Sequence, residues 1–427
     1  MNLKINFLSI CICLFASLSL AQQADNYAFT TNKSSSLINL TNPTRLLGAG
    51  VTNVSSATTP IGFEFWFMGN RYTSFSINAN GAIQLGSDAI LPAGNAYNIA
   101  NRARIIAFSA GERAAMTGAT IGDWRVSAND GVIQYQVAGN APNRTLVIEC
   151  RNMNINFQST TNDATFQIVL YETAPLASGN NRGGRIEFRY AQAQTTYDMN
   201  SLRVGFGLGE SNNQFKGVDL STDPPTARIG NDAIENRMSR GVISILNGDA
   251  DGSRRIFVFE SPQPNAQATN LRSACAGEGE VKLEWDNTAT NAVGSALYRS
   301  TDGRTFTFLT QAARGTNTFT DKGLSASQTY YYRVYSATEG KLSELHPTAQ
   351  LTYMIARQTG KINIEGRPVL CNGIATLKAE QGFDFYEWYD SGGNLLRADS
   401  IGSINISQSG KYKVRGILKS SNLYHEF

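Results

Sequence analysis

Apolar and polar residues alternate with a period of two in residues 61–86, the stretch around which the rest of the chain is organised. Phe63, Phe65 and Phe67 fall in one phase, and Glu64 and Trp66 fall in the other. This pattern is typical of a β-strand with one buried face. Turn dipeptides and returning strands are predicted at Gly69-Asn70, 72–77, Asn80-Gly81 and 82–85. The stretch therefore predicts an antiparallel meander with an aromatic inner face.

Similar short runs, separated by turn residues, continue to about residue 260. They lie at 132–137, 145–150, 166–171, 185–190, 202–208 and 243–245. No long segment shows helical periodicity, so residues 22–260 are predicted to form one antiparallel β-sandwich or jelly roll. A domain of this length buries a substantial core without help from disulfides.

Two smaller β-sandwich modules are expected after this domain, at residues 266–353 and 358–427. The polar run 261–265 contains two prolines and predicts an extended, semi-rigid linker before the first of them. The predicted fold class is all-β, with one large N-terminal sandwich followed by two small ones.

The meander carries the pattern F-x-F-x-x-x-G-x-x-Y followed by N-G-x-I-x-x-G. Its residues are Phe63, Phe65, Gly69, Tyr72, Asn80, Gly81, Ile83 and Gly86. This pattern resembles the nidogen-like (NIDO) domain of exported bacterial surface proteins. The chain departs from that family at 105–113, where a Trp-Asp element is usual. The resemblance implies an extracellular interaction module.

The second module resembles a fibronectin type III domain. Residues 281–285 alternate and end on Trp285, the core tryptophan of that family, and Gly323-Leu324 precedes the tyrosine-rich run 330–334. Tyr330, Tyr332 and Val334 are expected to face the core, with Tyr331 and Arg333 facing outward.

The third module resembles a bacterial immunoglobulin-like domain. Trp388 lies in the strand-like run 386–389, and a late corner and strand follow at 409–414. Because the inter-sheet disulfide of antibody domains is absent, Leu377 and Val414 are expected to fill that part of the core.

Residues 1–21 have the features of a secretory signal peptide. Lys4 supplies the positive charge, residues 5–20 form a short apolar core, and cleavage is expected after Ala21. The alternative, an uncleaved anchor, is disfavoured because the segment is short and polar chain follows at once. No later stretch is apolar enough to span a bilayer. A secreted, cell-surface-associated protein is expected.

Three cysteines follow the leader, Cys150, Cys275 and Cys371, one in each predicted domain. An odd number of widely spaced cysteines does not form a disulfide scaffold, and buried or free thiols are expected. A Cys275–Cys371 bridge stays open as the minor alternative.

The composition argues against several function classes. A net charge of +3 without a cluster of basic residues disfavours nucleic acid as a partner. The two histidines, His346 and His425, both lie outside the N-terminal domain, so that domain cannot hold a His-dependent triad. No hydrolase, zinc or P-loop motif is present. A carboxylate pair for glycoside hydrolysis has no local signature and stays open, but the chain is expected not to be an enzyme.

One stretch, residues 247–252, resembles the start of a calcium loop. Asn247, Asp249 and Asp251 supply oxygen ligands at alternate positions, but the twelfth position is Val258 where a bidentate glutamate is needed. The alternative is a hairpin turn between strands at 242–246 and 254–259. No other cofactor is indicated.

Trp66 and Trp124 are the candidate ligand-binding residues. Trp66 is out of phase with the phenylalanine row, and Trp124 lies in a polar Gly-Asp-Trp-Arg sequence. A solvent-facing tryptophan stacks on a sugar or docks into a partner. The alternative is that a loop or a second sheet covers each ring.

These observations predict a non-enzymatic exported protein that acts in adhesion, protein interaction or surface-complex assembly, with a protein or glycan partner at the cell surface. The alternatives are a carbohydrate-binding protein or polysaccharide-acting enzyme that uses the N-terminal sandwich, and a purely structural stalk.

Overall fold

The computed structural model describes most of the chain after the leader. The described ranges are 24–92, 102–110, 115–116, 119–120, 124–155, 160–175, 182–195, 199–208, 214–230, 236–238, 241–242, 254–277, 279–325, 328–354, 363–365, 375–379, 381–408, 410–418 and 423–426. The leader, the run 243–245 and Cys371 lie outside them. No α-helix occurs in these ranges, whose regular elements are the short 3₁₀ turns η1 (Ala24–Asn26) and η2 (Pro347–Ala349) and β-strands. The predicted all-β fold is confirmed.

Contacts divide the chain into two compact units. The first comprises Met1–Cys275, Val281–Asp321 and Tyr330–Tyr353, and the second comprises Ala276–Glu280, Lys322–Thr329 and Met354–Phe427. The large N-terminal sandwich and most of the second module thus belong to one unit.

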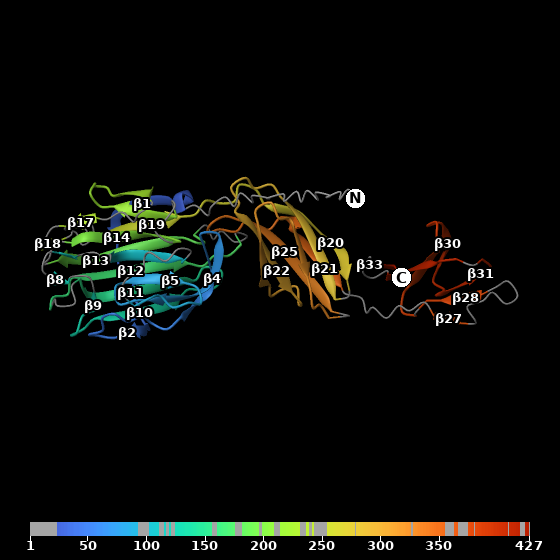
Figure 1. Ribbon diagram of the computed structural model, residues 1–427, viewed down its shortest axis with the longest axis horizontal. Helices are drawn as coiled ribbons and strands as arrows, with labels where there is room; N and C mark the ends of the chain where they lie inside the picture. Colours follow the sequence, from blue (N-terminus) through green and yellow to red (C-terminus); the bar gives the residue numbers. More distant parts are fainter. Residues whose placement is uncertain are drawn as a thin grey trace, which may run out of the picture. The chain divides into compact units, whose positions relative to one another are not determined.

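The N-terminal sandwich consists of two antiparallel sheets (Figure 1). The first has the order β1 (Ala28–Ser35), β19 (Arg254–Glu260), β13 (Ile186–Thr195), β12 (Ala164–Tyr171), β11 (Thr145–Asn154), β10 (Val132–Ala138) and β2 (Thr44–Leu47), with β18 (Gly241–Val242) paired to β13 and β9 (Arg125–Val126) to β11. The second has the order β16 (Thr226–Gly230), β15 (Phe215–Asp219), β14 (Met199–Gly207), β6 (Arg104–Ala110), β5 (Ala82–Leu85), β4 (Asn70–Ile77) and β3 (Thr59–Phe67), with β17 (Asn236–Met238) on β14. A separate small ribbon pairs β7 (Ala115–Met116) with β8 (Ala119–Thr120).

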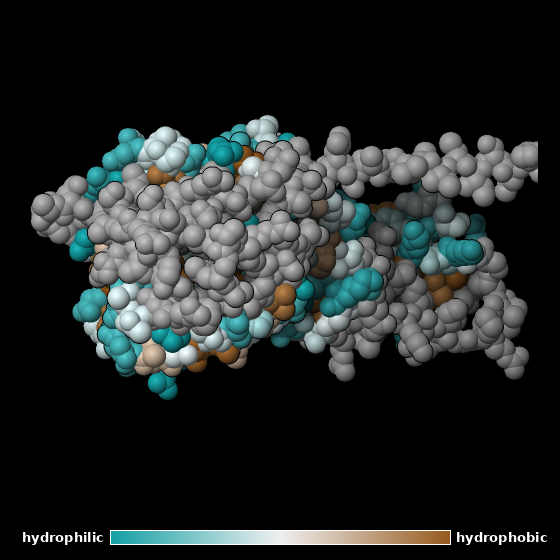
Figure 2. Space-filling model, turned by 60° about the vertical axis from the view of Figure 1, so that its left-hand side comes forward, coloured by the Kyte–Doolittle hydropathy of each residue, from teal (hydrophilic) through white to brown (hydrophobic). Residues whose placement is uncertain are grey.

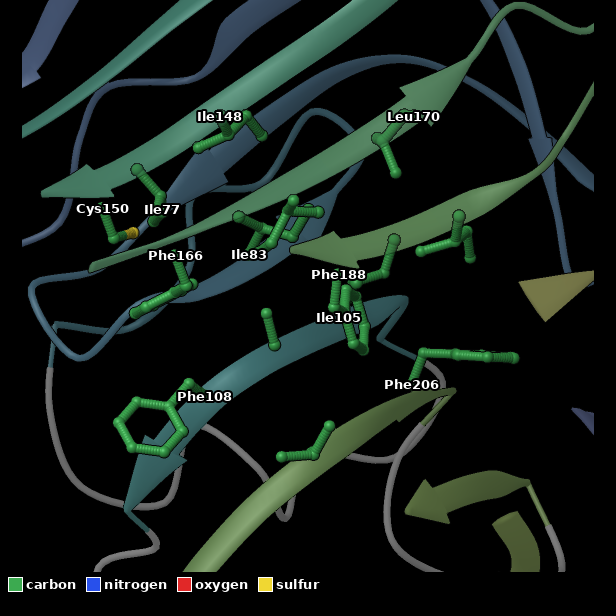
Figure 3. Packing of buried hydrophobic residues seen from close by; sticks show 14 of the residues in the cluster. Ile77, Ile83, Ile105, Phe108, Ile148, Cys150, Phe166, Leu170, Phe188 and Phe206 are labelled. Atoms are coloured by element: carbon green, nitrogen blue, oxygen red, sulfur yellow. The ribbon is translucent and has the colours of Figure 1, made fainter. Parts of the chain in front are cut away.

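The core lies between the two sheets and follows the alternation in the sequence. Figure 3 shows how apolar side chains of both sheets meet in it, and the labelled ones are Ile77, Ile83, Ile105, Phe108, Ile148, Cys150, Phe166, Leu170, Phe188 and Phe206. Cys150 is a buried free thiol within this cluster, and burial raises its pKa. The cysteine therefore packs as a small apolar group.

The first hairpin differs from the prediction by one residue. Phe67 pairs with Asn70, so the two-residue turn is Met68-Gly69 rather than Gly69-Asn70. Both turn residues have positive φ, 49° at Met68 and 76° at Gly69. A two-residue turn whose twist matches that of the flanking strands favours positive φ at both turn residues. Methionine was not expected to adopt a positive φ.

The second module is a two-sheet sandwich of seven strands. One sheet has the order β20 (Ala268–Gly277), β21 (Glu280–Asn287) and β24 (Thr318–Asp321), and the other has β23 (Thr307–Ala313), β22 (Gly294–Ser300), β25 (Thr329–Ala337) and β26 (Gln350–Met354). Tyr330, Tyr332 and Val334 are buried, as predicted, and Tyr331 and Arg333 are half-buried. The module has a fibronectin type III-like fold.

The third module also has two antiparallel sheets. These have the orders β27 (Asn363–Glu365), β28 (Ala375–Lys378), β31 (Ser403–Ile406), and β30 (Leu395–Asp399), β29 (Phe385–Tyr389), β32 (Lys413–Leu418), β33 (Leu423–Glu426). Leu377 and Val414 pack with Trp388 in its core, which is the filling predicted from the sequence.

Candidate functional site: the junction between the sandwich and the second module

Trp124 is a core residue of the sandwich. Its ring is fully buried and meets Phe108 edge-on at 4.9 Å between centroids, and Phe166 at 6.5 Å. Its backbone N–H donates to the side-chain oxygen of Asn80. The indole offers no surface to a ligand as it lies in the structure.

Trp66 is also fully buried, but outside the sandwich core. It packs in a separate cluster with residues of the second module, Ala296, Tyr298, Tyr335, Ala337 and Leu342. The two tryptophan candidates therefore belong to different clusters, and the structure does not bring them together. Trp66 marks the place where the two modules meet, which we call the junction.

The calcium candidates Asn247, Asp249 and Asp251 lie outside the described residues. The strands that flank them, β18 and β19, both pair with β13 in the described ranges. The part of the chain that the structure describes contains no group of three or more His, Cys, Asp or Glu side chains placed to hold a metal ion.

Aromatic rings meet edge-to-face at the junction. Phe308 meets Trp66 at 6.0 Å and Tyr298 at 5.7 Å, and Tyr298 meets Tyr335 at 5.6 Å. The guanidinium of Arg71 lies over the Phe308 ring at 4.7 Å. Edge-to-face pairs and cation–π contacts both add to the energy of simple apolar burial.

A charged pair of the sandwich is joined to a tyrosine of the second module. Glu64 and Arg71 form an ion pair at 2.8 Å, and the Tyr298 hydroxyl donates to the other carboxylate oxygen of Glu64 at 2.6 Å. Burial raises the pKa of Tyr298 well above its ordinary value, and the nearby charge of Glu64 raises it further. The hydroxyl therefore stays a donor.

The tip of the first hairpin is hydrogen-bonded to the loop between β25 and β26. The Gly69 N–H donates to the carbonyl of Glu339 at 2.8 Å, and the side-chain amide of Gln311 donates to the Gly69 carbonyl. At the N-terminus, the amide of Asn26 donates to the Glu339 carboxylate at 2.6 Å. Glu339 is almost completely buried, and two residues far from it in sequence, Asn26 and Gly69, hold it in place.

The chain approaches itself most closely at two glycines of this region. A Cβ on Gly184, which has a φ of +69°, would lie 2.0 Å from the Gly340 carbonyl oxygen. Real Cβ atoms do not come so near, so this contact needs glycine at 184. The predicted linker begins here too, because the Ser261 hydroxyl accepts from the Gly340 N–H at 2.9 Å. The linker is thus bonded to the second module at its start.

Sequence reasoning missed most of the junction residues. Glu64 and Arg71 look like ordinary outward residues of a hairpin, and Tyr298 and Tyr335 look like alternating strand residues. The one available signal was Trp66, a large apolar residue in the polar phase of its strand. The partners are more than 200 positions away in sequence, so local periodicity cannot find them.

On the face drawn in Figure 2, hydrophilic atoms and small apolar groups are interspersed over the described residues. Among those residues, no helix is long or apolar enough to cross a bilayer.

A family model described as NIDO related matches residues 26–247, which are 222 of the 427 residues. No curated protein matches the chain. Among solved structures, a two-domain fibronectin type III segment of chicken tenascin is 12% identical, with a TM-score of 0.21, over 38% of this chain and 98% of that one. A structure described as a myokine is 18% identical, with a TM-score of 0.19, over 22% and 100%.

A further match is pectate lyase PelI from Erwinia chrysanthemi in complex with tetragalacturonic acid. It is 21% identical, with a TM-score of 0.16, over 20% of this chain and 27% of that one. At such TM-scores none of these structural similarities carries a functional argument.

Proposed function

Since this chain belongs to the NIDO-related family, we propose that it is an exported, non-enzymatic interaction protein that binds a protein partner at the cell surface. The sandwich and the fibronectin type III-like module form its recognition unit. The third module, with its immunoglobulin-like sequence pattern, acts as a spacer. The signal-peptide pattern of residues 1–21 supports export.

The observation that carries this proposal is the junction around Trp66. A flexible pair of modules loses conformational freedom when both touch one partner, and that loss weakens binding. Here aromatic packing, the Tyr298–Glu64 hydrogen bond and the Gly69–Glu339 backbone bond already fix the pair. The two modules therefore present one continuous, preorganised surface.

The test uses the full chain without its leader, labelled and applied to cells of the source organism. We expect saturable binding that protease treatment of the cells abolishes and glycosidase treatment leaves intact. Wild type and a Trp66→Ala variant should differ in affinity, because the variant separates the two halves of the surface. Trp66→Phe is the matched control, since it keeps an aromatic ring in the junction.

Two outcomes would contradict the proposal. Binding that survives protease treatment but is lost after glycosidase treatment, with a matching signal on a glycan array, would identify a carbohydrate-binding protein. Release of reducing ends from a polysaccharide by the purified chain would identify an enzyme.

A further inference from the structure

The first described residues form an arm that precedes β2 in the chain and packs on the first sheet of the sandwich. We define the N-terminal arm as residues 24–42, which comprise η1, β1 and a segment without regular structure, Ser36–Asn42. β1 lies at one edge of the first sheet, and β2, which follows the arm after Pro43, pairs at the other edge. The arm therefore runs from one edge of the sheet to the other, and Asn42-Pro43 is its covalent connection to β2.

The strand of the arm is held mainly by its backbone. β1 pairs with β19 over Ala28–Asn32, but Ala28, Thr30 and Asn32 are exposed. Phe29 is the one large apolar residue of β1, and it contacts Phe257 and Phe259 with centroids 5.6 and 5.1 Å apart. Backbone pairing of this kind is reproduced wherever the same strand meets the same edge.

The segment Ser36–Asn42 crosses the outer face of the sheet and is bound there by side chains. The amide of Gln167, itself fully buried, accepts from the Ile38 N–H and donates to the Ile38 carbonyl, both at 2.8 Å. Gln136 accepts from the Asn42 N–H at 2.9 Å. Ile38 and Leu40 cover an apolar patch on β11 and β12 that consists of Val147, Val169 and Tyr171.

The start of the arm is anchored by a buried lysine. The Lys216 ammonium donates to the carbonyls of Asp25 and Tyr27 at 3.1 and 2.6 Å. Tyr27 is fully buried, and its hydroxyl accepts from the Met68 N–H at 3.1 Å.

These contacts show what the sandwich would lose without the arm. If it left, β19 would become a bare sheet edge over Phe257 and Phe259, the outer patch would be exposed, and Lys216 would lose two acceptors. An uncovered edge and patch of this kind recruit another strand. The occupant that restores every contact is an arm of identical sequence.

We propose that two copies of this chain exchange their N-terminal arms, with Asn42-Pro43 as the hinge. Each arm then makes the same contacts to the other copy's β19, Gln167 and Lys216 that it makes here to its own. Such an exchange is isologous and closes as a two-fold dimer. The partner is a second copy of this chain, and the proposal does not depend on what the recognition unit binds.

The test traps the exchange with a cross-strand disulfide. Thr30 and Val258 face each other in the β1–β19 register on the side away from the core. A chain without its leader that carries Thr30→Cys is mixed with one carrying Val258→Cys, both with Cys275 and Cys371 replaced by serine. The mixture is incubated at high concentration in sub-denaturing urea, then diluted and oxidised. We expect a disulfide-linked heterodimer.

A second cysteine pair distinguishes exchange from random collision. Lys282 and Thr320 face each other between β21 and β24, so that Lys282→Cys mixed with Thr320→Cys should stay monomeric. The chain carrying both Thr30→Cys and Val258→Cys should lock its arm internally and lose the dimer that wild type forms on a sizing column. Equal cross-linking in both mixtures would overturn the proposal, and so would a wild type that stays monomeric after the same treatment.

Discussion

Replacing Trp66 by alanine tests whether the junction couples the sandwich to the second module. The Trp66 side chain is fully buried among residues of the second module. A tryptophan buries roughly 200 Å², and at about 25 cal/mol per Å² this corresponds to about 5 kcal/mol of apolar burial. Measured losses for such truncations are about 3–5 kcal/mol, because the surrounding structure partly collapses into the cavity.

This loss should appear in both modules. In the native state the modules are docked, so that opening either of them also breaks the junction. Trp66→Ala should therefore lower the free energy of opening of each module by about 3–5 kcal/mol. The two losses should be of similar size, because each is measured from the same docked state.

The assay is native-state hydrogen exchange of the full chain, followed by mass spectrometry. Peptides from β11–β13 give the opening free energy of the sandwich, and peptides from β21–β25 give that of the second module. Trp66→Phe should cause a smaller loss in both modules. If Trp66→Ala lowered neither free energy by more than about 0.5 kcal/mol, the size expected for an ordinary surface change, the junction would not couple the modules.

Three further changes have defined outcomes. Tyr298→Phe should reduce the loss of stability in alkali. The raised pKa keeps Tyr298 protonated in the folded chain while the unfolded chain ionises above about pH 10, so this contribution to wild-type stability is complete below that pH and falls above it by up to about 1.4 kcal/mol per pH unit. If the urea midpoints of wild type and variant fell equally between about pH 9 and 11, this reasoning would be wrong. Gly81→Ala should cost about 2–4 kcal/mol of stability, because φ is +79° and the new Cβ would lie 2.7 Å from Phe166. Gly315→Ala, at φ +82° with nothing within 4 Å, should cost about 1 kcal/mol. Similar urea midpoints for the two variants would contradict the steric reason. Gly184→Ala should loosen the junction through its clash with the Gly340 carbonyl, seen as faster hydrogen exchange in residues 338–343, and unchanged exchange there would show that the contact gives way freely.

The strands could be predicted because burial of one sheet face imposes a period of two. That constraint located β5 at its observed bounds, Ala82–Leu85, and it assigned Tyr330, Tyr332 and Val334 to the core. It placed the first turn one residue late, because a methionine at positive φ contradicts local preference and is imposed by the register of the hairpin.

Trp66 shows where such reasoning ends. Alternation correctly directs its side chain away from the phenylalanine row, but it does not say whether solvent or protein lies on that side. The answer depends on Tyr298 and Tyr335, which approach only after two modules have folded and docked. Contacts of this kind have no local pattern, and so the junction became visible only in the structure.

The four tryptophans of the chain lie in four separate surroundings. Trp124 is in the sandwich core, Trp285 in the second module, Trp388 in the third, and Trp66 at the junction, all of them almost completely shielded from water. Each indole is therefore an intrinsic optical probe of one compartment, and a red shift in its emission would report water entering that compartment alone. A set of single-tryptophan chains would resolve the order in which this protein comes apart, without any attached dye.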